Sequence, residues 1–218
     1  MIDDPLFTPR AKPETYGSWW NNNEKGLDWY EEIFNSRRVV HEAFLDWVRS
    51  LDAQGRGPCS ILEVGCGRAI TYPEFFKARR YFGFDVSAKE IDWCRLHRAS
   101  PGHEYGHGDI IEARFAEKFG LVFSHAVIDH VYDINAFLAA LVGASSGWVY
   151  VTSYRGWFPD LASHTYRWNE TDTCFYNDIS APETKALLGR LGCRHIRVFP
   201  LGTLKAEIPQ ETVILAHV

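Results

Sequence analysis

Short apolar runs and amphipathic stretches alternate along the chain from residue 60 to residue 191. Apolar runs of strand length lie near residues 60–65, 81–85, 103–106, 119–124 and 147–153. Between and after them, apolar positions recur at helical spacing near residues 70–79, 88–98, 111–117, 133–143 and 182–191. This alternation predicts an α/β fold with right-handed crossovers, and therefore a doubly wound, mostly parallel sheet with helices on both faces.

The beginning of the chain has a different pattern. Residues 1–23 are rich in Pro, Asn and Trp and are predicted to be loop, whereas residues 24–51 carry apolar groups at helical spacing and predict one or two helices. A Gly/Pro linker follows at 55–58. We therefore expect an N-terminal helical extension or cap at residues 1–57 and a ligand-binding domain at residues 58–218.

The first predicted strand runs directly into two glycines. Residues 61–67 read Ile-Leu-Glu-Val-Gly-Cys-Gly, and only glycine lets a backbone turn tightly and lie against a ligand without a Cβ in the way. Glu63, at the carboxyl end of the strand, favours a ligand with cationic or donor groups over one with bare phosphates. The spacing Glu63-x-Gly65-x-Gly67 resembles motif I of the class I S-adenosylmethionine (SAM)-dependent methyltransferases, with Ala69 where that family usually has a third glycine.

Acidic residues follow the next two strands. Asp85 ends the second strand, where a doubly wound sheet places an acid that accepts hydrogen bonds from ribose hydroxyls, and the resemblance implies the same role here. Ser87 and Glu90 fit a capping box for the following helix, which leaves Asp85 free for another role. In the family an acid after the third strand accepts from the adenine amino group and an apolar neighbour packs on the ring. Asp109 and Ile110 match that pattern, and their alternative interpretation is a surface turn.

The resemblance implies SAM as the cofactor and a seven-stranded sheet of order 3-2-1-4-5-7-6. Residues 194–200 and 211–217 are two strand-like runs without a helix between them, as expected if the last strand inserts antiparallel. Residues 121–131 resemble motif IV, where the fourth strand ends against the methionine part of the cofactor. The expected cofactor-binding residues are Glu63, Gly65, Cys66, Gly67, Asp85, Val86, Asp109, Ile110, Ser124 and His125.

A histidine just past the fourth strand is the first candidate for the chemistry. Methyl transfer is an in-line displacement, and a hydroxyl acceptor is helped by a general base, for which histidine suits neutral pH. His130 is that candidate, while Asp129 could orient it or be the base itself. His125 is closer to the strand end and could touch the cofactor instead. The alternative for each is a hydrogen-bonded loop or cap residue. No set of acids is placed like a catechol-type Mg²⁺ site, so we expect no metal.

The segment after the fifth strand, residues 153–181, is predicted to be a long loop, and such loops are usually functional or mobile. Its aromatic residues could form a wall over a flat or sugar-like acceptor, and its arginines could grip a carboxylate or phosphate. The candidate substrate-binding residues are Tyr154, Arg155, Trp157, His164 and Arg167. At the other end of the chain, Tyr16, Trp19 and Trp20 are candidates either to close the same cleft or to pack the N-terminal helix onto the sheet.

Composition narrows the classes of partner. The chain has 218 residues, 46% hydrophobic and 23% charged, which suits one domain with a good core. A net charge of −5 disfavours nucleic acid, and no apolar stretch is long enough to predict a membrane span. The acidic start lacks the apolar core of a secretory signal, and five cysteines without a Cys-x-x-Cys pair favour reduced thiols in the cytoplasm. The oligomeric state is not predicted.

These patterns predict an enzyme, a SAM-dependent methyltransferase acting on a small molecule. Oxygen is the favoured acceptor atom, in a sugar, a nucleotide sugar or a natural-product intermediate. Amino groups of nucleobases or glutamine are disfavoured because no Asn-Pro-Pro-Tyr or Asp-Pro-Pro-Tyr run follows the fourth strand. The alternatives are N-methylation of a small molecule, a non-catalytic SAM-fold binding subunit, and a nicotinamide-dependent oxidoreductase. The last would need Gly-x-Gly-x-x-Gly, and Ile70 stands where its third glycine should be.

Overall fold

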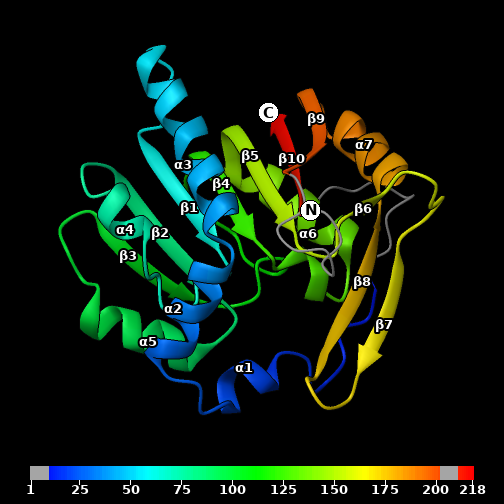
Figure 1. The fold of residues 1–218 in the computed structure, drawn as a ribbon, viewed down its shortest axis with the longest axis horizontal. Helices are drawn as coiled ribbons and strands as arrows, with labels where there is room; N and C mark the ends of the chain where they lie inside the picture. Colours follow the sequence, from blue (N-terminus) through cyan, green and yellow to red (C-terminus); the bar gives the residue numbers. More distant parts are fainter. Residues whose placement is uncertain (1–9, 202–210) are drawn as a thin grey trace.

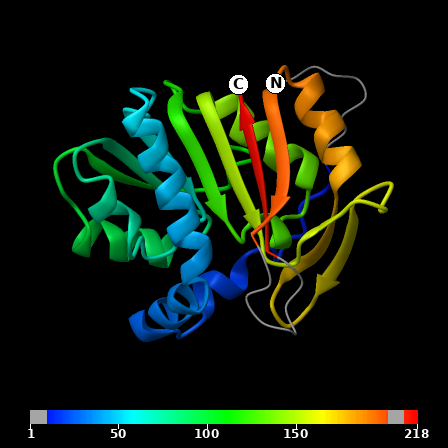
Figure 2. The ribbon, with the colours of Figure 1, turned by 45° about the horizontal axis from the view of Figure 1, so that its top comes forward.

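A seven-stranded sheet forms the centre of the molecule (Figures 1 and 2). The computed structural model describes residues 10–201 and 211–218. The strands follow the order β3-β2-β1-β4-β5-β10-β9. Their bounds are β1 Ser60–Val64, β2 Arg80–Asp85, β3 His103–His107, β4 Phe119–His125, β5 Ser145–Ser153, β9 Arg194–Pro200 and β10 Thr212–His217. β10 is antiparallel to both β5 and β9, so the predicted order and the antiparallel last strand are confirmed.

The register of the parallel strands brings the candidate residues to one edge. Glu63 in β1 lies opposite Gly83 of β2 and Phe123 of β4, and Asp85 of β2 lies opposite His107 of β3. The carboxyl ends of β1 to β4 therefore lie side by side. In an open α/β sheet this edge is where ligands bind.

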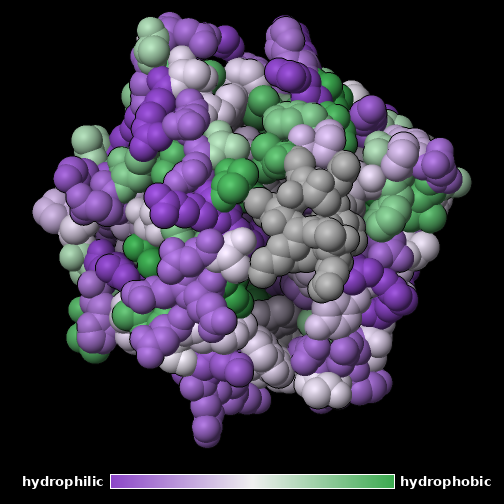
Figure 3. Space-filling model, viewed as in Figure 1, coloured by the Kyte–Doolittle hydropathy of each residue, from purple (hydrophilic) through white to green (hydrophobic). Residues whose placement is uncertain are grey.

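Helices α3 (Arg38–Ala53), α4 (Tyr72–Phe75) and α5 (Ala88–His97) contribute to the core on one face of the sheet. In α3 the apolar residues recur every three or four positions, so Val40, Phe44 and Val48 all point inward and are fully buried. The ring of Phe44 packs 4.6 Å from that of Phe123 in β4. Hydrophilic residues predominate on the outer side of α3 in the view of Figure 3. This helix is thus an amphipathic layer of the fold.

The other face is covered by α6 (Ile134–Ala144) and α7 (Ala181–Arg190). Both helices begin at a polar cap. The Asp133 carboxylate accepts from the backbone N–H of Ala136 at 2.8 Å, and the Ser180 hydroxyl accepts from that of Glu183 at 3.1 Å. Most of α6 is apolar and buried, which fits a helix lying directly on the sheet.

The segment predicted as a long loop contains a second sheet, so that prediction was wrong. Strands β6 (Trp157–Phe158), β7 (Thr165–Asn169) and β8 (Cys174–Ser180) form it in the order β6-β8-β7. Asn177 of β8 donates to the backbone carbonyls of Ile128 and Val131 at 2.9 and 2.8 Å. These bonds hold the second sheet against the 3₁₀ helix η1 (Ile128–His130), which follows β4.

Two predicted helices differ from the structure. Residues 111–117 are not helical: a turn at 110–112, with the Asp109 carbonyl accepting from the N–H groups of Glu112 and Ala113, leads into irregular chain. Phe115 in this chain packs against Phe84 of β2. The helix predicted at 70–79 is reduced to the short α4.

The N-terminal part contains one more helix than expected. Helix α1 (Ser18–Asn22) lies within the predicted loop, and residues 24–51 hold α2 (Leu27–Ser36) and most of α3. Residues 1–9 lie outside the described part of the chain. The domain boundary at residues 57 and 58 stays a prediction.

Within residues 10–201 and 211–218, no helix combines the length and apolar character needed to cross a bilayer. The same residues contain no group of three or more His, Cys, Asp or Glu side chains placed to hold a metal ion. All five cysteines carry free thiols.

Candidate active site

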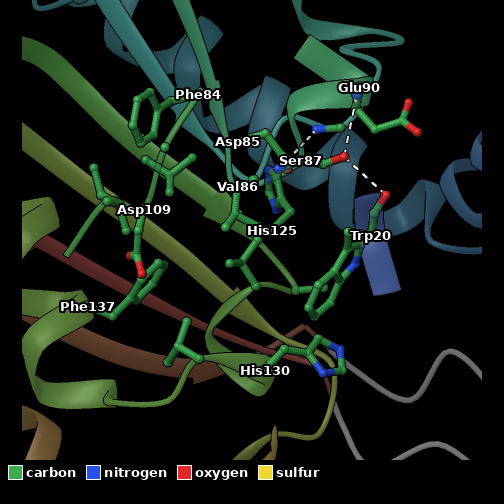
Figure 4. Close-up of a pocket in the computed structure, with 18 of the residues that line it drawn as sticks. Trp20, Phe84, Asp85, Val86, Ser87, Glu90, Asp109, His125, His130 and Phe137 are labelled. Carbon is green, nitrogen blue, oxygen red and sulfur yellow. Dashed lines mark hydrogen bonds between the residues drawn. The ribbon is translucent and has the colours of Figure 1, made fainter. Parts of the chain in front are cut away.

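A cavity of about 450 Å³ lies beyond the carboxyl ends of β1, β2 and β4 (Figure 4). This volume is within the usual range for small-molecule sites. Its walls include Tyr16, Trp20, Trp29, Tyr30, Arg37, Gly65, Gly67, Asp85, Val86, Asp109, Ile110, His125, Ala126, Val127, His130 and Tyr154. The fold therefore brings most of the expected cofactor residues to this cavity, together with the candidate base His130 and one expected substrate residue, Tyr154.

The turn after β1 requires its glycines. Gly65 has φ +77°, and a Cβ built there would lie 2.1 Å from a methyl carbon of Val127. Gly67 has φ +49°, and its Cβ would lie 3.0 Å from the ring of Tyr30. Ala69 has φ +46°, so the position where the family usually has glycine is left-handed here too, and alanine occupies it at a steric cost.

Asp85 is held by the turn that it faces. Its carboxylate accepts from the backbone N–H groups of Gly67 and Ser87, each at 2.8 Å. Burial raises the pKa of Asp85, and these two bonds partly oppose the rise. The Ser87 hydroxyl caps α5 as predicted, accepting from Glu90 N–H at 3.4 Å. Asp85 is thus not free, but each of its oxygens keeps a second lone pair for a ligand hydroxyl.

Asp109 lies at the end of the cavity nearest β3. One of its oxygens accepts from the N–H of Ile111 at 3.0 Å, and the other forms an ion pair with Lys12 at 3.0 Å. The side chain of Ile110 is buried beside it and lines the cavity. An acid and an apolar side chain are therefore adjacent, as expected for adenine recognition, with a lysine of the N-terminal segment next to them.

Residues 10–23, here called the N-terminal strap, run across the cavity. Thr173, at the tip of the β7–β8 hairpin, accepts through its carbonyl from Gly17 N–H at 3.0 Å and through its hydroxyl from Trp19 N–H at 2.9 Å. Tyr16 and Trp20 line the cavity, whereas the ring of Trp19 packs near that of Trp29. Of the three aromatic residues that were candidates either to close the cleft or to pack the N-terminal helix, Tyr16 and Trp20 line the cavity and Trp19 does not.

His130 faces the cavity in a defined protonation state. Its Nδ1 lies 3.0 Å from the carbonyl oxygen of Phe175, which can only accept, so Nδ1 carries the proton. In the neutral ring the lone pair is then on Nε2, which lies 3.3 Å from the hydroxyl of Tyr154. Burial lowers the pKa of His130, and the nearby charge of Asp129 partly opposes this. The result is a neutral imidazole whose basic nitrogen accepts from the Tyr154 hydroxyl, another residue of the cavity wall.

Asp129 does not line the cavity. It is fully buried and accepts from the Ser153 hydroxyl at 2.6 Å and from the N–H groups of Arg155 and Tyr154 at 3.1 and 3.3 Å. Burial raises its pKa. The expectation that Asp129 orients His130 or acts as the base is therefore corrected, because its oxygens hold the turn that carries Tyr154.

His125 lies at the end of β4 beside a buried ion pair. Its Nδ1 lies 3.1 Å from the Thr152 hydroxyl, which also accepts from Arg37 at 3.4 Å. Arg37 is paired with Glu211. Burial, with the positive charge of Arg37 and the nearby His41, lowers the pKa of His125 well below its ordinary value. His125 is thus a neutral wall residue.

Three expected cofactor residues turn away from the cavity. Glu63 accepts from the Tyr81 hydroxyl inside the core, and burial raises its pKa to about 8. The thiol of Cys66 is buried in the core on the α3 side of the sheet. The Ser124 hydroxyl donates to the carbonyl of Val64 at 2.8 Å and ties β4 to β1.

Four expected substrate residues also lie elsewhere. Arg155 and Arg167 both form ion pairs with Asp178 of β8, at 2.8 and 3.3 Å. Trp157 is buried in the core near α6 and α7, and His164 accepts from the backbone N–H of Ser180 at 3.0 Å. The predicted arginine grip on an anionic acceptor is therefore not supported by their positions.

Several wall residues were not predicted as ligand contacts. Tyr30 and Arg37 were interpreted only as parts of helices that pack on the sheet, and helical spacing cannot reveal that α2 reaches the glycine turn. Ala126 has φ +57° directly after His125, and no glycine marks this left-handed position in the sequence. Such strained positions often accompany functional sites. Among the described residues that line the cavity, Arg37 is the only lysine or arginine.

Comparison with known proteins agrees with this geometry. Residues 62–146 match the model of a methyltransferase domain family. A ubiquinone biosynthesis O-methyltransferase from Bradyrhizobium sp. (strain ORS 278) is 30% identical over 142 residues, which is 59% of this chain and 56% of that protein. A relative with the same description from Bartonella quintana (strain Toulouse) is 25% identical over 195 residues, covering 79% of this chain and 76% of its own. The chain thus spans about half the length of the first of these relatives.

Solved structures share the whole fold at low sequence identity. A magnesium protoporphyrin IX methyltransferase from Synechocystis PCC 6803, crystallised with SAM, has a TM-score of 0.63 and 16% identity, covering 92% of this chain and 93% of its own. A Burkholderia thailandensis 1,6-didemethyltoxoflavin-N1-methyltransferase with bound S-adenosylhomocysteine has a TM-score of 0.62 and 15% identity, covering 97% and 92%. Taken with the sheet order, these likenesses show that the chain has the class I, Rossmann-like fold of SAM-dependent methyltransferases, and that residues 62–146 form a methyltransferase domain.

Proposed function

We propose that this chain methylates a hydroxyl oxygen of a small molecule, with SAM as methyl donor and His130 as general base. The observation that carries the proposal is the fixed tautomer of His130. Its Nδ1–H is held by the Phe175 carbonyl, and its Nε2 lone pair faces the hydroxyl of Tyr154, which also lines the cavity and which an acceptor hydroxyl would replace. A general base needs this arrangement, and a neutral imidazole is the suitable form near neutral pH.

The side chains that line the cavity fit the polar and apolar groups of the cofactor. Asp85 and Asp109 supply acceptors for ribose hydroxyls and an adenine amino group, and Ile110 supplies an apolar neighbour for the ring. Arg37 brings positive charge suited to an amino-acid carboxylate, although its pairing with Glu211 means that it would be shared. The glycine turn lets the backbone approach closely. When bound, SAM supplies a methyl group on a positively charged sulfur, which becomes a neutral thioether as the methyl leaves.

The residues of the chain then have separate tasks. Asp85, Asp109 and the glycine turn hold SAM in one position. With the acceptor held beside it, the two reactants lose less entropy on reaching the transition state, and this lowers the barrier. Nε2 of His130 accepts the proton of the acceptor hydroxyl and later releases it to solvent. The Tyr154 hydroxyl, 3.3 Å from Nε2, marks where an acceptor oxygen can hydrogen-bond. Tyr16 and Trp20 of the strap shield this part of the cavity from water.

The lining favours an uncharged, flat acceptor over a phosphorylated one. Arg155 and Arg167 are engaged with Asp178, and Arg37 is engaged with Glu211, so no free cation remains among the described wall residues to bind a phosphate. Aromatic rings dominate the wall around His130. A phenolic natural-product intermediate fits this better than a nucleotide sugar. The O-methyltransferase names of the sequence relatives support oxygen over nitrogen as the acceptor atom.

The test has two stages that use the full-length chain. First, calorimetry with S-adenosylhomocysteine measures cofactor-site binding. Second, SAM is incubated with the protein and a panel of simple phenols, aliphatic alcohols and amines, and methylated products are identified by mass spectrometry. We expect methyl ethers from phenols, with product formation strongly reduced in His130→Gln. Methylated amines would favour the N-methylation alternative. Binding of S-adenosylhomocysteine without any methylated product would favour a non-catalytic binding subunit.

A further inference from the structure

Trp20 of the strap joins the candidate base to the cofactor side of the cavity. Its indole lines the cavity and lies 5.8 Å from the imidazole of His130, with the two ring planes at 65°. Figure 4 shows the indole lying towards His130 while the Trp20 backbone is bonded to Ser87. A large flat apolar surface therefore borders the imidazole of His130 within the cavity.

The backbone of Trp20 is held in place at the start of α5. Its carbonyl accepts from the Ser87 hydroxyl at 3.1 Å, and the side-chain carbonyl of the next residue, Asn21, accepts from Ala88 N–H at 2.9 Å. Ser87 and Ala88, which donate these two bonds, follow shortly after Asp85, the expected ribose ligand. The backbone that carries the indole is therefore held in place. A ring held in one position loses little conformational entropy when a substrate packs on it.

The neighbouring tryptophan has a different ring environment. Trp19 does not line the cavity, and its ring packs 5.9 Å from that of Trp20 and 6.1 Å from that of Trp29. The ring of Tyr154 also lies close to His130, 5.6 Å from the imidazole. An acceptor whose hydroxyl reaches Nε2 would therefore contact Trp20 and Tyr154 but not Trp19.

We propose that Trp20 determines acceptor specificity, by providing the face on which a planar aromatic ring packs while its hydroxyl meets Nε2 of His130. This inference rests on the proposed function and narrows its substrate class to aromatic hydroxyl compounds. An aromatic pair is favourable beyond the area that it buries, whereas a saturated ring of the same size gains only the burial. Trp20 should therefore separate phenol from cyclohexanol.

The experiment compares these two probes on protein saturated with S-adenosylhomocysteine, which fills the cofactor part of the cavity. Calorimetry gives the Kd of phenol and of cyclohexanol for the wild type, Trp20→Leu, Trp20→Phe and the control Trp19→Phe. We expect Trp20→Leu to reduce the preference for phenol over cyclohexanol by about 2- to 12-fold, the size of one aromatic pair interaction. Trp20→Phe should keep most of the preference, and Trp19→Phe should keep all of it.

A second measurement does not depend on how a variant folds. In ¹⁵N-indole spectra of the wild type saturated with S-adenosylhomocysteine, phenol should shift the Trp20 signal and leave that of Trp19 nearly unchanged. Equal losses of phenol and cyclohexanol affinity in Trp20→Leu would overturn the inference, as would a Trp20 signal that ignores phenol or a wild type that binds no phenol. If S-adenosylhomocysteine itself fails to bind, the proposed function fails first, so the two failures are distinguishable.

Discussion

Replacing Asp85 with asparagine tests the cofactor site at the residue on which it most depends. Both carboxylate oxygens accept a backbone N–H, from Gly67 and Ser87, at 2.8 Å. Asparagine keeps the volume but has one oxygen and one NH₂ group, so a donor must face one of these N–H groups. The variant also loses the charge that strengthens bonds from ribose hydroxyls. A hydrogen bond to a charged group contributes about 1.5–3 kcal/mol, so we expect about 10- to 150-fold weaker binding of S-adenosylhomocysteine.

Isothermal titration calorimetry at neutral pH measures this change directly. Asp92→Asn is the matched control, because Asp92 is exposed in α5, the helix after β2, and pairs with Arg95 at 3.1 Å outside the cavity. The control should bind S-adenosylhomocysteine like the wild type. An unchanged Kd for Asp85→Asn would refute the assignment of the ribose site, and an equal loss in both variants would show a general effect of charge. Since burial raises the pKa of Asp85, wild-type affinity should also begin to fall on acidification at a higher pH than an ordinary aspartate would give.

Three further predictions concern the base, the core and a buried acid. His130→Gln should lower turnover on an accepted phenol by about 10²–10⁴-fold with nearly unchanged Kd for S-adenosylhomocysteine. A single-turnover rate of the variant equal to that of the wild type would mean that another residue is the base. Phe44→Ala should reduce the free energy of unfolding in urea by about 3–5 kcal/mol, and a loss below about 1 kcal/mol would mean that α3 is not a core layer. Burial raises the pKa of folded Glu63 from 4.5 to about 8, so the folded state binds a proton that the unfolded state lacks and wild-type stability falls as pH rises through that window. Glu63→Gln lacks this loss, and its stability relative to wild type should therefore rise from pH 5 to pH 8 in urea titrations.

The main sheet was predictable because its signals are local and agree with one another. Each parallel strand is a short apolar run that ends in a glycine turn, an acid or a polar loop, and the helix after β2 begins at the predicted Ser87 cap. Asp85, Asp109 and His130 reached the cavity because each comes at or directly after the carboxyl end of a strand. Position along the sheet, more than residue type, made these predictions succeed.

The second sheet was missed because its turn lacks the usual signal. The β7–β8 connection contains no glycine, and Thr173 adopts φ +45° instead, which is uncommon for a β-branched residue. Without that turn, Arg155 and Arg167 were interpreted as free groups in a loop. The hairpin instead places Asp178 of β8 beside Arg167 of β7, and Asp178 also pairs with Arg155, which precedes β6. A cross-strand ion pair of this kind depends on register, which the sequence pattern did not reveal.

The direction in which a side chain points was also beyond the sequence. Asp129 and His130 are neighbours, yet the 3₁₀ turn sends one carboxylate into the core and one imidazole to the cavity. Glu63 precedes the glycine turn but meets Tyr81 across the sheet. Their partners come from β5, β8 and β2, so only the assembled fold determines these orientations.

The strand order has a consequence for how the protein is made. β10 is synthesised after every other strand of the main sheet, yet it pairs with both β5 and β9. Until β10 has been translated, one edge of β5 has no partner strand. Arg37 likewise lacks Glu211, with which it forms an ion pair in the folded protein. Strands β1 to β4 can therefore pair early during translation. The complete cavity forms only after β10 has left the ribosomal exit tunnel.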